Sequence, residues 1–211
     1  MLIARYWLER LFNCSFEFIQ FEDFIINPEL IKLLFEDEGK ISLQFRSKTA
    51  YLSFCNNSAS LLNIAMNHLI TRENLTIGNF ENDSENYIDD LFKLLVNKGK
   101  NFPRIRIEIL NSSKIHDLLI KHIETSTDLS KMVARITLVY GHYSNVRINL
   151  SPRATNIEKI FEIRGYLIDY EYYTKYKLTN IYNPKMEFSI CCNEGRSDEV
   201  VSKVNIERIN G

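Results

Sequence analysis

The feature that most constrains this fold is an alternation of helix-like and strand-like patterns, in units of about thirty residues, that continues to about Tyr140. The first unit, Arg5–Phe35, reads as a helix, a short strand, a turn and a second helix. Phe16 and Phe18 alternate with other residues as in a half-buried strand. Residues 27–29, Asn-Pro-Glu, predict the start of the second helix, because Asn caps free N–H groups and Pro suits the first helical position.

Strand patterns recur at similar spacing and are separated by helix patterns. They begin near Phe16, Ile41, Leu75, Ile105 and Ile136, in steps of 25, 34, 30 and 31 residues. Strands joined through helices predict a parallel sheet with right-handed crossovers. The expected fold class is therefore α/β, with leucine-rich-repeat-like helix–strand repeats and a mainly parallel sheet. A compact three-layer α/β sandwich is the alternative, because the repeat is irregular.

The pattern changes after Gly141. A helical signal is limited to a turn or two around residues 155–161, and alternation in residues 200–209 predicts a strand. Asn183-Pro184 predicts a turn between two further strand-like segments. We therefore expect residues 1–141 to form the repeat region. Residues 142–211 should form a β-rich C-terminal cap packed on the same domain.

Composition excludes several functional classes. The 211 residues carry a formal net charge of −1, so nothing drives the chain as a whole toward nucleic acid or an anionic membrane. No run approaches the roughly 20 apolar residues that span a bilayer. Arg5, Glu9 and Arg10 interrupt the stretch where a signal peptide would be apolar. We expect an intracellular protein, cytoplasmic or nuclear, without a membrane or nucleic-acid partner.

The most unusual local composition is a tyrosine-rich stretch near the C-terminus. Its tyrosines are Tyr166, Tyr170, Tyr172, Tyr173, Tyr176 and Tyr182, and Lys175, Lys177 and Lys185 lie among them. Such a stretch could stack bases, bind an acidic partner, or supply the site of an enzyme or ligand-binding protein. The alternative is a strand with aromatic residues on both faces, since strands favour aromatic residues.

Residues with potential chemistry form no recognisable set. No phosphate-binding loop, nucleophile elbow or zinc-ligand spacing occurs. His116 and His122 are six apart on one predicted helix and so point to different faces, with His122 near the apolar stripe. Cys191 and Cys192 are adjacent, so in a strand they point to opposite faces as separate thiols. We assign no catalytic, cofactor-binding or metal-ligating residue, expect no cofactor, and expect that the protein is not an enzyme.

Several phrases carry a family resemblance that covers most of the chain. They are RYWLERLFNCSFEFIQFEDFIINPELIKLLF, DLLIKHIETSTDLSKMVARITLVYG, INLSPRATNIEK and YTKYKLTNIYNPKMEFSI. Together they resemble the F-box and F-box-associated proteins that are expanded in plant-parasitic nematodes, root-knot nematodes in particular. In that family a helical F-box docks on the Skp-type adaptor of a cullin ubiquitin ligase, and a following repeat domain is thought to hold the substrate.

The resemblance implies that this chain is the C-terminal repeat region without the F-box. Its expected function is a non-catalytic protein-interaction domain, the substrate-recognition part of an F-box-type ubiquitin-ligase subunit. The expected partner is a protein substrate, whose identity and contact residues the sequence does not give. A Skp-type adaptor is an expected partner only where an F-box lies upstream.

Overall fold

The computed structural model describes residues 2–22, 28–35, 43–53, 58–78, 85–110, 112–141, 145–164, 169–194 and 200–210. Helices and strands alternate in the first two thirds of the chain, and the elements described after β5 are all strands. The helices are α1 (Leu2–Phe12), α2 (Pro28–Phe35), α3 (Ser58–His68), α4 (Glu85–Asn97) and α5 (Lys114–Thr125). The strands are β1 (Ser15–Phe21), β2 (Phe45–Ser53), β3 (Leu69–Gly78), β4 (Arg104–Leu110), β5 (Arg135–Tyr140), β6 (Thr155–Arg164), β7 (Asp169–Thr179), β8 (Glu187–Glu194) and β9 (Val201–Asn210).

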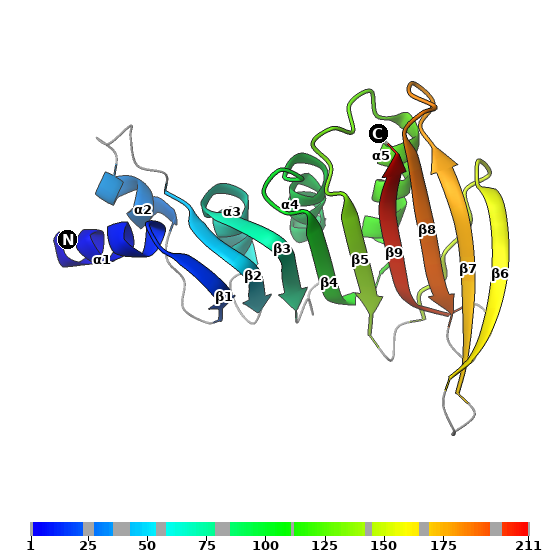
Figure 1. Ribbon diagram of the computed structural model, residues 1–211, viewed down its shortest axis with the longest axis horizontal. Helices are drawn as coiled ribbons and strands as arrows, with labels where there is room; N and C mark the ends of the chain where they lie inside the picture. Colours follow the sequence, from blue (N-terminus) through cyan, green and yellow to red (C-terminus); the bar gives the residue numbers. More distant parts are fainter. Residues whose placement is uncertain are drawn as a thin grey trace.

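All these strands belong to one sheet in the order β1-β2-β3-β4-β5-β9-β8-β7-β6 (Figure 1). The first five lie in chain order and pair in parallel. The last four are antiparallel to their neighbours, and β9 adds directly to β5. The fold is therefore α/β with a mixed sheet, and only its N-terminal half is parallel. The C-terminal strands extend the sheet sideways.

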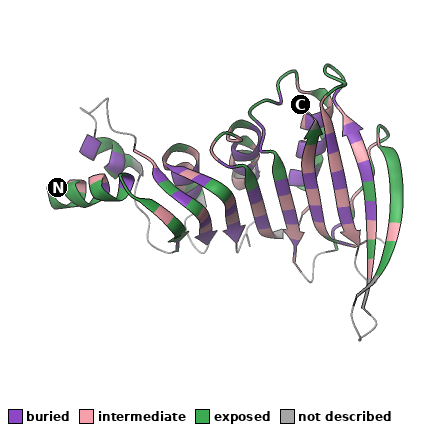
Figure 2. Ribbon diagram, in the orientation of Figure 1, coloured by how far each residue is buried: buried purple, intermediate pink, exposed green. Residues whose placement is uncertain are grey.

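The helices pack on one face of the sheet, and no helix that the structure describes covers the other face. In Figure 1, α3, α4 and α5 lie behind the strands. Burial alternates along each central strand, as Figure 2 shows. In β4, for example, Ile105 and Ile107 are completely buried, whereas Arg106 and Glu108 keep part of their surface in water. One apolar core therefore lies between the sheet and the helix layer.

Apolar stripes on the helices form the helix side of this core. In α4, Ile88, Leu91 and Leu95 are buried as their spacing of three and four residues requires. Gly99 lies two residues after the end of α4. A Cβ atom at Gly99 would lie 2.4 Å from the backbone oxygen of Met132, so only glycine fits this close approach.

Strand β2 is displaced from its predicted position. The pattern predicts a strand at residues 41–45, but β2 runs from Phe45 to Ser53, and residues 41 and 42 lie outside the described part. The buried positions of β2 include the small residues Ser47 and Ala50, and the pairing with β3 shifts between Ser47 and Thr49. Small inward residues and a shift in register together hide the alternation that would reveal this strand.

The weak helical signal at residues 155–161 is wrong, because this segment belongs to strand β6. Ile157, Ile160 and Phe161 are spaced like one face of a helix, yet the segment pairs with β7 along its length. The turn at Asn183-Pro184 lies between β7 and β8, where the backbone N–H of Met186 donates to the carbonyl of Asn183 at 2.9 Å.

Candidate functional site: the open face of the sheet

The surface most suited to function is the side of the sheet that faces away from the helices, which we call the open face. Its central row contains one residue from each of seven neighbouring strands, aligned by the strand pairing. These residues are Tyr51, Thr76, Arg106, Thr137, Asn205, Cys191 and Lys175. All seven are partly or fully exposed, and no described helix covers them. Six strand pairings thus set polar side chains at regular intervals of about 4.8 Å.

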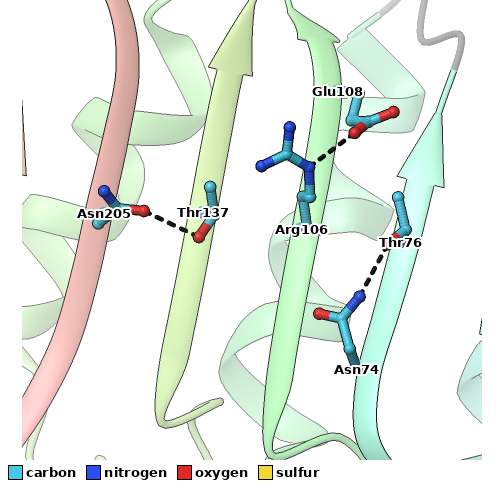
Figure 3. Close-up of polar contacts among 6 residues, drawn as sticks. All are labelled: Asn74, Thr76, Arg106, Glu108, Thr137 and Asn205. Atoms are coloured by element: carbon cyan, nitrogen blue, oxygen red, sulfur yellow. Dashed lines mark hydrogen bonds and ion pairs between the residues drawn. The ribbon is translucent and has the colours of Figure 1, made fainter. Parts of the chain in front are cut away.

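Hydrogen bonds hold several side chains of the open face in place (Figure 3). The amide of Asn74 donates to the hydroxyl of Thr76 at 2.8 Å within β3. Between β5 and β9, the hydroxyl of Thr137 donates to Oδ1 of Asn205 at 3.0 Å. Hydrogen bonds already restrict these side chains. Binding of a partner therefore costs less side-chain conformational entropy than it would on a flexible surface.

Arginines concentrate in the middle of the open face. Arg104 of β4 is in register with Arg135 of β5, and Arg106 lies one position along the same face. Arg135 pairs with Glu207 at 2.6 Å, and Arg106 pairs with Glu108 at 2.6 Å. Within the described part of the chain, Arg104 is exposed and forms no ion pair. A guanidinium without a partner can bind a carboxylate of another molecule through two parallel hydrogen bonds.

The tyrosine-rich stretch does not converge on one site. Tyr173 lies on the open face and donates its hydroxyl to Glu171. Tyr172 points to the other side, where its ring packs against Phe161 with centroids 5.0 Å apart. Tyr176 is buried, and Tyr182 is exposed after β7. Tyr166 and the side chain of Tyr170 lie outside the described part.

A cavity of about 580 Å³ lies on the helix side of the C-terminal strands. It is lined by Arg147, Ile148, Asn149, Leu150, Lys159, Thr174, Cys192, Glu194 and Val201. The hydroxyl of Thr174 donates to the carboxylate of Glu194 at 2.6 Å. Burial raises the pKa of the Cys192 thiol to about 12, so this sulfur is protonated near neutral pH. Lys175, Lys177 and Lys185 are not among the lining residues.

The two histidines of α5 occupy different environments. His116 is the more deeply buried, 1% exposed, and its Nδ1 lies 3.0 Å from Asp117 Oδ1. This hydrogen bond holds the pKa of Asp117 below its usual value. His122 packs edge-on against Phe92 with centroids 5.5 Å apart, and burial lowers its pKa. Among the residues that the structure describes, no group of three His, Cys, Asp or Glu side chains is placed to hold a metal ion.

Sequence reasoning did not identify the open-face residues as a site. Arg104, Arg106 and Glu108 are visible in the sequence as the polar side of one strand, but Glu207 and Asn205 come from the last strand of the chain. Only the order of the strands in the sheet brings them together. A search for polar residues at alternating positions in every predicted strand is the signal that could have found them.

Comparisons with known proteins give a limited answer. A family model described as a domain of unknown function (DUF8381) matches residues 1–80. No curated protein and no solved structure matches the chain. Within the described residues, no helix combines the length and the apolar character that crossing a membrane requires. The matched residues run from α1 to just beyond the end of β3, so the similarity covers the first units of the alternating region and leaves the function open.

Proposed function

We propose that this chain is a non-catalytic protein-interaction domain that binds its partner on the open face of the sheet. The observation that carries this proposal is the one-sided packing of the helices. It leaves a row of partly exposed polar side chains that extends over seven strands. Arg104 lies beside the middle of this row and forms no ion pair with the residues that the structure describes. A surface of this width and polarity suits a folded protein better than a small molecule.

We further propose that the N-terminal units are leucine-rich-repeat-like. In support, β1 to β5 follow one another in chain order, and each is joined to the next through a helix. Stacked units of this kind create extended binding surfaces on their strand side. In this proposal the four antiparallel strands widen the same surface.

The resemblance to F-box-associated proteins suggests the cellular role. We propose that the chain is the substrate-recognition part of an F-box-type ubiquitin-ligase subunit. The partner would be a protein substrate, and a Skp-type adaptor would bind only a form with an upstream F-box. Both the phrases that carry the resemblance and the uncovered sheet face are consistent with the substrate-facing part of such a subunit.

Charge reversal on the open face, compared with charge reversal away from it, tests the open-face proposal. The variant Arg104→Glu/Arg106→Glu changes the open face, and the control Lys121→Glu/Lys131→Glu makes the same change in charge at two exposed positions away from it. Affinity capture with quantitative mass spectrometry should find proteins that the wild type and the control retain and the open-face variant loses by about tenfold or more. Equal recovery with both variants would contradict the proposal.

A second capture experiment tests the ubiquitin-ligase role. The 211-residue chain should recover a target without the Skp-type adaptor, and a form extended upstream by an F-box should recover both. Recovery of adaptor and cullin by the 211-residue chain alone would show that this division of labour is wrong. If neither form captured a protein and the purified chain converted a small molecule, the interaction-domain proposal would fail.

The cavity beside Cys192 favours a second candidate function, binding of a small ligand. Its volume of about 580 Å³ is in the range of small-molecule sites, and Lys159, Thr174 and Glu194 supply polar groups. A thermal-shift screen would test it. A binder whose effect disappears in Thr174→Val and persists in Arg104→Glu would support this candidate, and a screen without such a compound would count against it.

A further inference from the structure

We propose that the β1 end of the molecule is a self-association surface at which a second copy of this chain docks across a two-fold axis. This surface, which we call the β1 end, consists of β1 and the exposed sides of α1 and α2. It lies beyond the central row of the open face, and its Phe18 is in register with Thr49 and Asn74 on the same side of the sheet as that row. The proposal does not depend on the proposed function. Two independent features of the β1 end, a strand edge and an apolar helix layer, lead to it.

Strand β1 is an edge strand with little protection. Among the strands that the structure describes, only β2 pairs with it, and its outer backbone N–H and C=O groups are therefore available to another strand. The sequence SFEFIQF contains no Lys or Pro, and its one charge, Glu17, lies 3.6 Å from Lys48. A groove of about 560 Å³ runs along this edge, lined mainly by Phe16, Phe18, Ile19, Gln20, Phe21 and Glu22, with Leu11 and Phe45.

The helix layer next to this edge exposes a continuous apolar stripe. Ile3, Trp7 and Leu11 are spaced by four residues along α1, so they share one side of the helix. Ile3 is 76% exposed and Trp7 is 61% exposed. Because Leu11 also lines the groove along β1, the stripe is continuous with the strand edge. In α2, Leu33 is 63% exposed, so the second helix at this end also presents an apolar side chain to solvent.

A second copy covers both features, whereas an added peptide covers only one. A two-fold axis perpendicular to the sheet pairs β1 antiparallel with β1 of the partner copy. Both helix layers then lie on the same side and meet at Trp7 and its neighbours. A single extended peptide would satisfy the edge of β1 but would leave Ile3, Trp7 and Leu33 in water. The match in both layers therefore favours another β1 end as the occupant.

The exposed apolar area agrees with a stable dimer. Of the fourteen large apolar side chains that are exposed among the described residues, seven lie in this end of the chain: Ile3, Tyr6, Trp7, Leu11, Phe18, Leu30 and Leu33. With up to about 250 Å² per large side chain, their exposed fractions amount to roughly 800 Å² in each copy. A standard interface buries about 800 Å² per partner. The β1 end thus offers enough area for a dimer.

The opposite edge of the sheet is a poor partner for β1. The outer strand there, β6, carries Glu158, Lys159 and Glu162 among its exposed residues. Charges of this kind protect an edge from pairing. Head-to-tail pairing of β1 with β6 would also add one copy after another into an open-ended assembly. Two-fold pairing of β1 with β1 of a second copy gives a closed dimer. The expected assembly is a dimer of twice 24.8 kDa.

Sedimentation velocity of the full 211-residue chain at micromolar concentrations tests this proposal. The wild type should sediment as a dimer, and Phe18→Lys should raise the dimer dissociation constant by at least about tenfold. Trp7→Glu changes the helix layer and leaves the strand edge as it is. It should weaken the dimer too, because the helix layer is part of the proposed interface. The matched control is Phe161→Lys on the β6 edge, where Phe161 is 49% exposed, and this variant should remain dimeric. Circular dichroism verifies that each variant is folded.

Several outcomes would overturn the proposal. They are a monomeric wild type, a series of assemblies larger than a dimer, equal effects of Phe18→Lys and Phe161→Lys, or no effect of Trp7→Glu.

Disulfide cross-linking is a second measurement, and it does not depend on weakening the dimer. In a background in which Cys14, Cys55, Cys191 and Cys192 are replaced by serine, Phe18→Cys, Ile19→Cys and Gln20→Cys are tested one at a time. At least one of them should form an intermolecular disulfide under mild oxidation, because Cβ atoms near the axis lie within reach. A cysteine at position 161 should not, and cross-linking at position 161 alone would contradict the arrangement.

Discussion

At the scale of single residues, the adjacent thiols Cys191 and Cys192 face opposite sides of β8 and should differ in reactivity. Cys191 lies on the open face, whereas Cys192 is 3% exposed on the helix side. Burial raises the pKa of Cys192 to about 12, and only a thiolate reacts with alkylating reagents. At pH 8 we expect iodoacetamide to modify Cys191 before unfolding and Cys192 only after unfolding, with the exposed Cys14 as the rapid reference. Peptide mapping by mass spectrometry measures this, and comparable rates would show that Cys192 is accessible.

His122 should contribute to the pH dependence of stability. Burial against Phe92 lowers its pKa below the usual 6.5, so the unfolded chain binds a proton at this site more readily than the folded protein does. The stability that His122 permits is therefore present above pH 6.5 and is lost as the pH falls through the unfolded pKa toward the folded one. His122→Phe should reduce the loss of unfolding free energy between about pH 7.5 and 5.5, by at most about 1.4 kcal/mol per pH unit.

Urea unfolding at several pH values measures this slope. Lys121→Gln, at an exposed position on the same helix, is the control, because it leaves His122 and its packing unchanged. An unchanged slope in His122→Phe would mean that His122 has the same pKa in the folded and the unfolded chain. Phenylalanine also removes the buried Nε2 atom, which has no hydrogen-bond partner in the described part of the chain.

At the scale of elements, Asn180 joins the end of α5 to the end of β7. Its side chain is 2% exposed. The amide nitrogen donates to the carbonyls of Ile123 at 2.7 Å and Ser126 at 2.8 Å. Its oxygen accepts from the backbone N–H groups of Tyr182 and Asn183, each at 2.9 Å. One side chain thus satisfies four backbone groups of two elements, which explains why a polar residue is retained at a buried position.

Removing this side chain should be costly. Asn180→Ala leaves four backbone groups without their partner, and we expect a loss of about 2–4 kcal/mol in unfolding free energy. Asn183→Ala, at an exposed position three residues away, is the matched control and should change stability by less than about 0.5 kcal/mol. Chemical denaturation of both variants measures the difference. A loss below 1 kcal/mol in Asn180→Ala would indicate that water replaces the amide.

Comparison of three strands shows what the sequence could predict. Strand β4 was predictable because its inward residues, Ile105 and Ile107, are large and its outward residues are charged. The predicted position of strand β2 was displaced because Ser47 and Ala50 occupy inward positions. Strand β6 was missed because its apolar residues have helical spacing. In both cases pairing with a neighbouring strand decides the structure, and a local pattern does not contain that information.

The open face was less predictable than the elements that form it. Thr137 and Asn205 are 68 residues apart in the chain and form a hydrogen bond because β9 pairs with β5. Periodicity indicates which side of a strand is polar. It does not indicate which strands are neighbours, so the row of polar side chains emerges only from the topology.

At the scale of the whole molecule, the two predicted parts, 1–141 and 142–211, share one sheet. Strand β9 pairs with β5 from Arg135 to Val139, and its Val204 and Ile206 belong to the same core as Leu138 and Ile136. Helix α5 lies over the added strands and is held there by Asn180. Without residues 142–211, the edge of β5 and the inner side of α5 would face water.

Fragment 1–141 alone should therefore unfold with low cooperativity and bind a dye specific for exposed apolar surface. Addition of fragment 142–211 should restore a cooperative transition, because β9 can again pair with β5 and cover α5. Calorimetry and circular dichroism of each fragment and of the mixture measure this, with the intact chain as reference. A fragment 1–141 that melts as sharply as the intact chain would show that the repeat region is an independent domain. In that case the C-terminal strands would be an addition to the sheet that the core does not require.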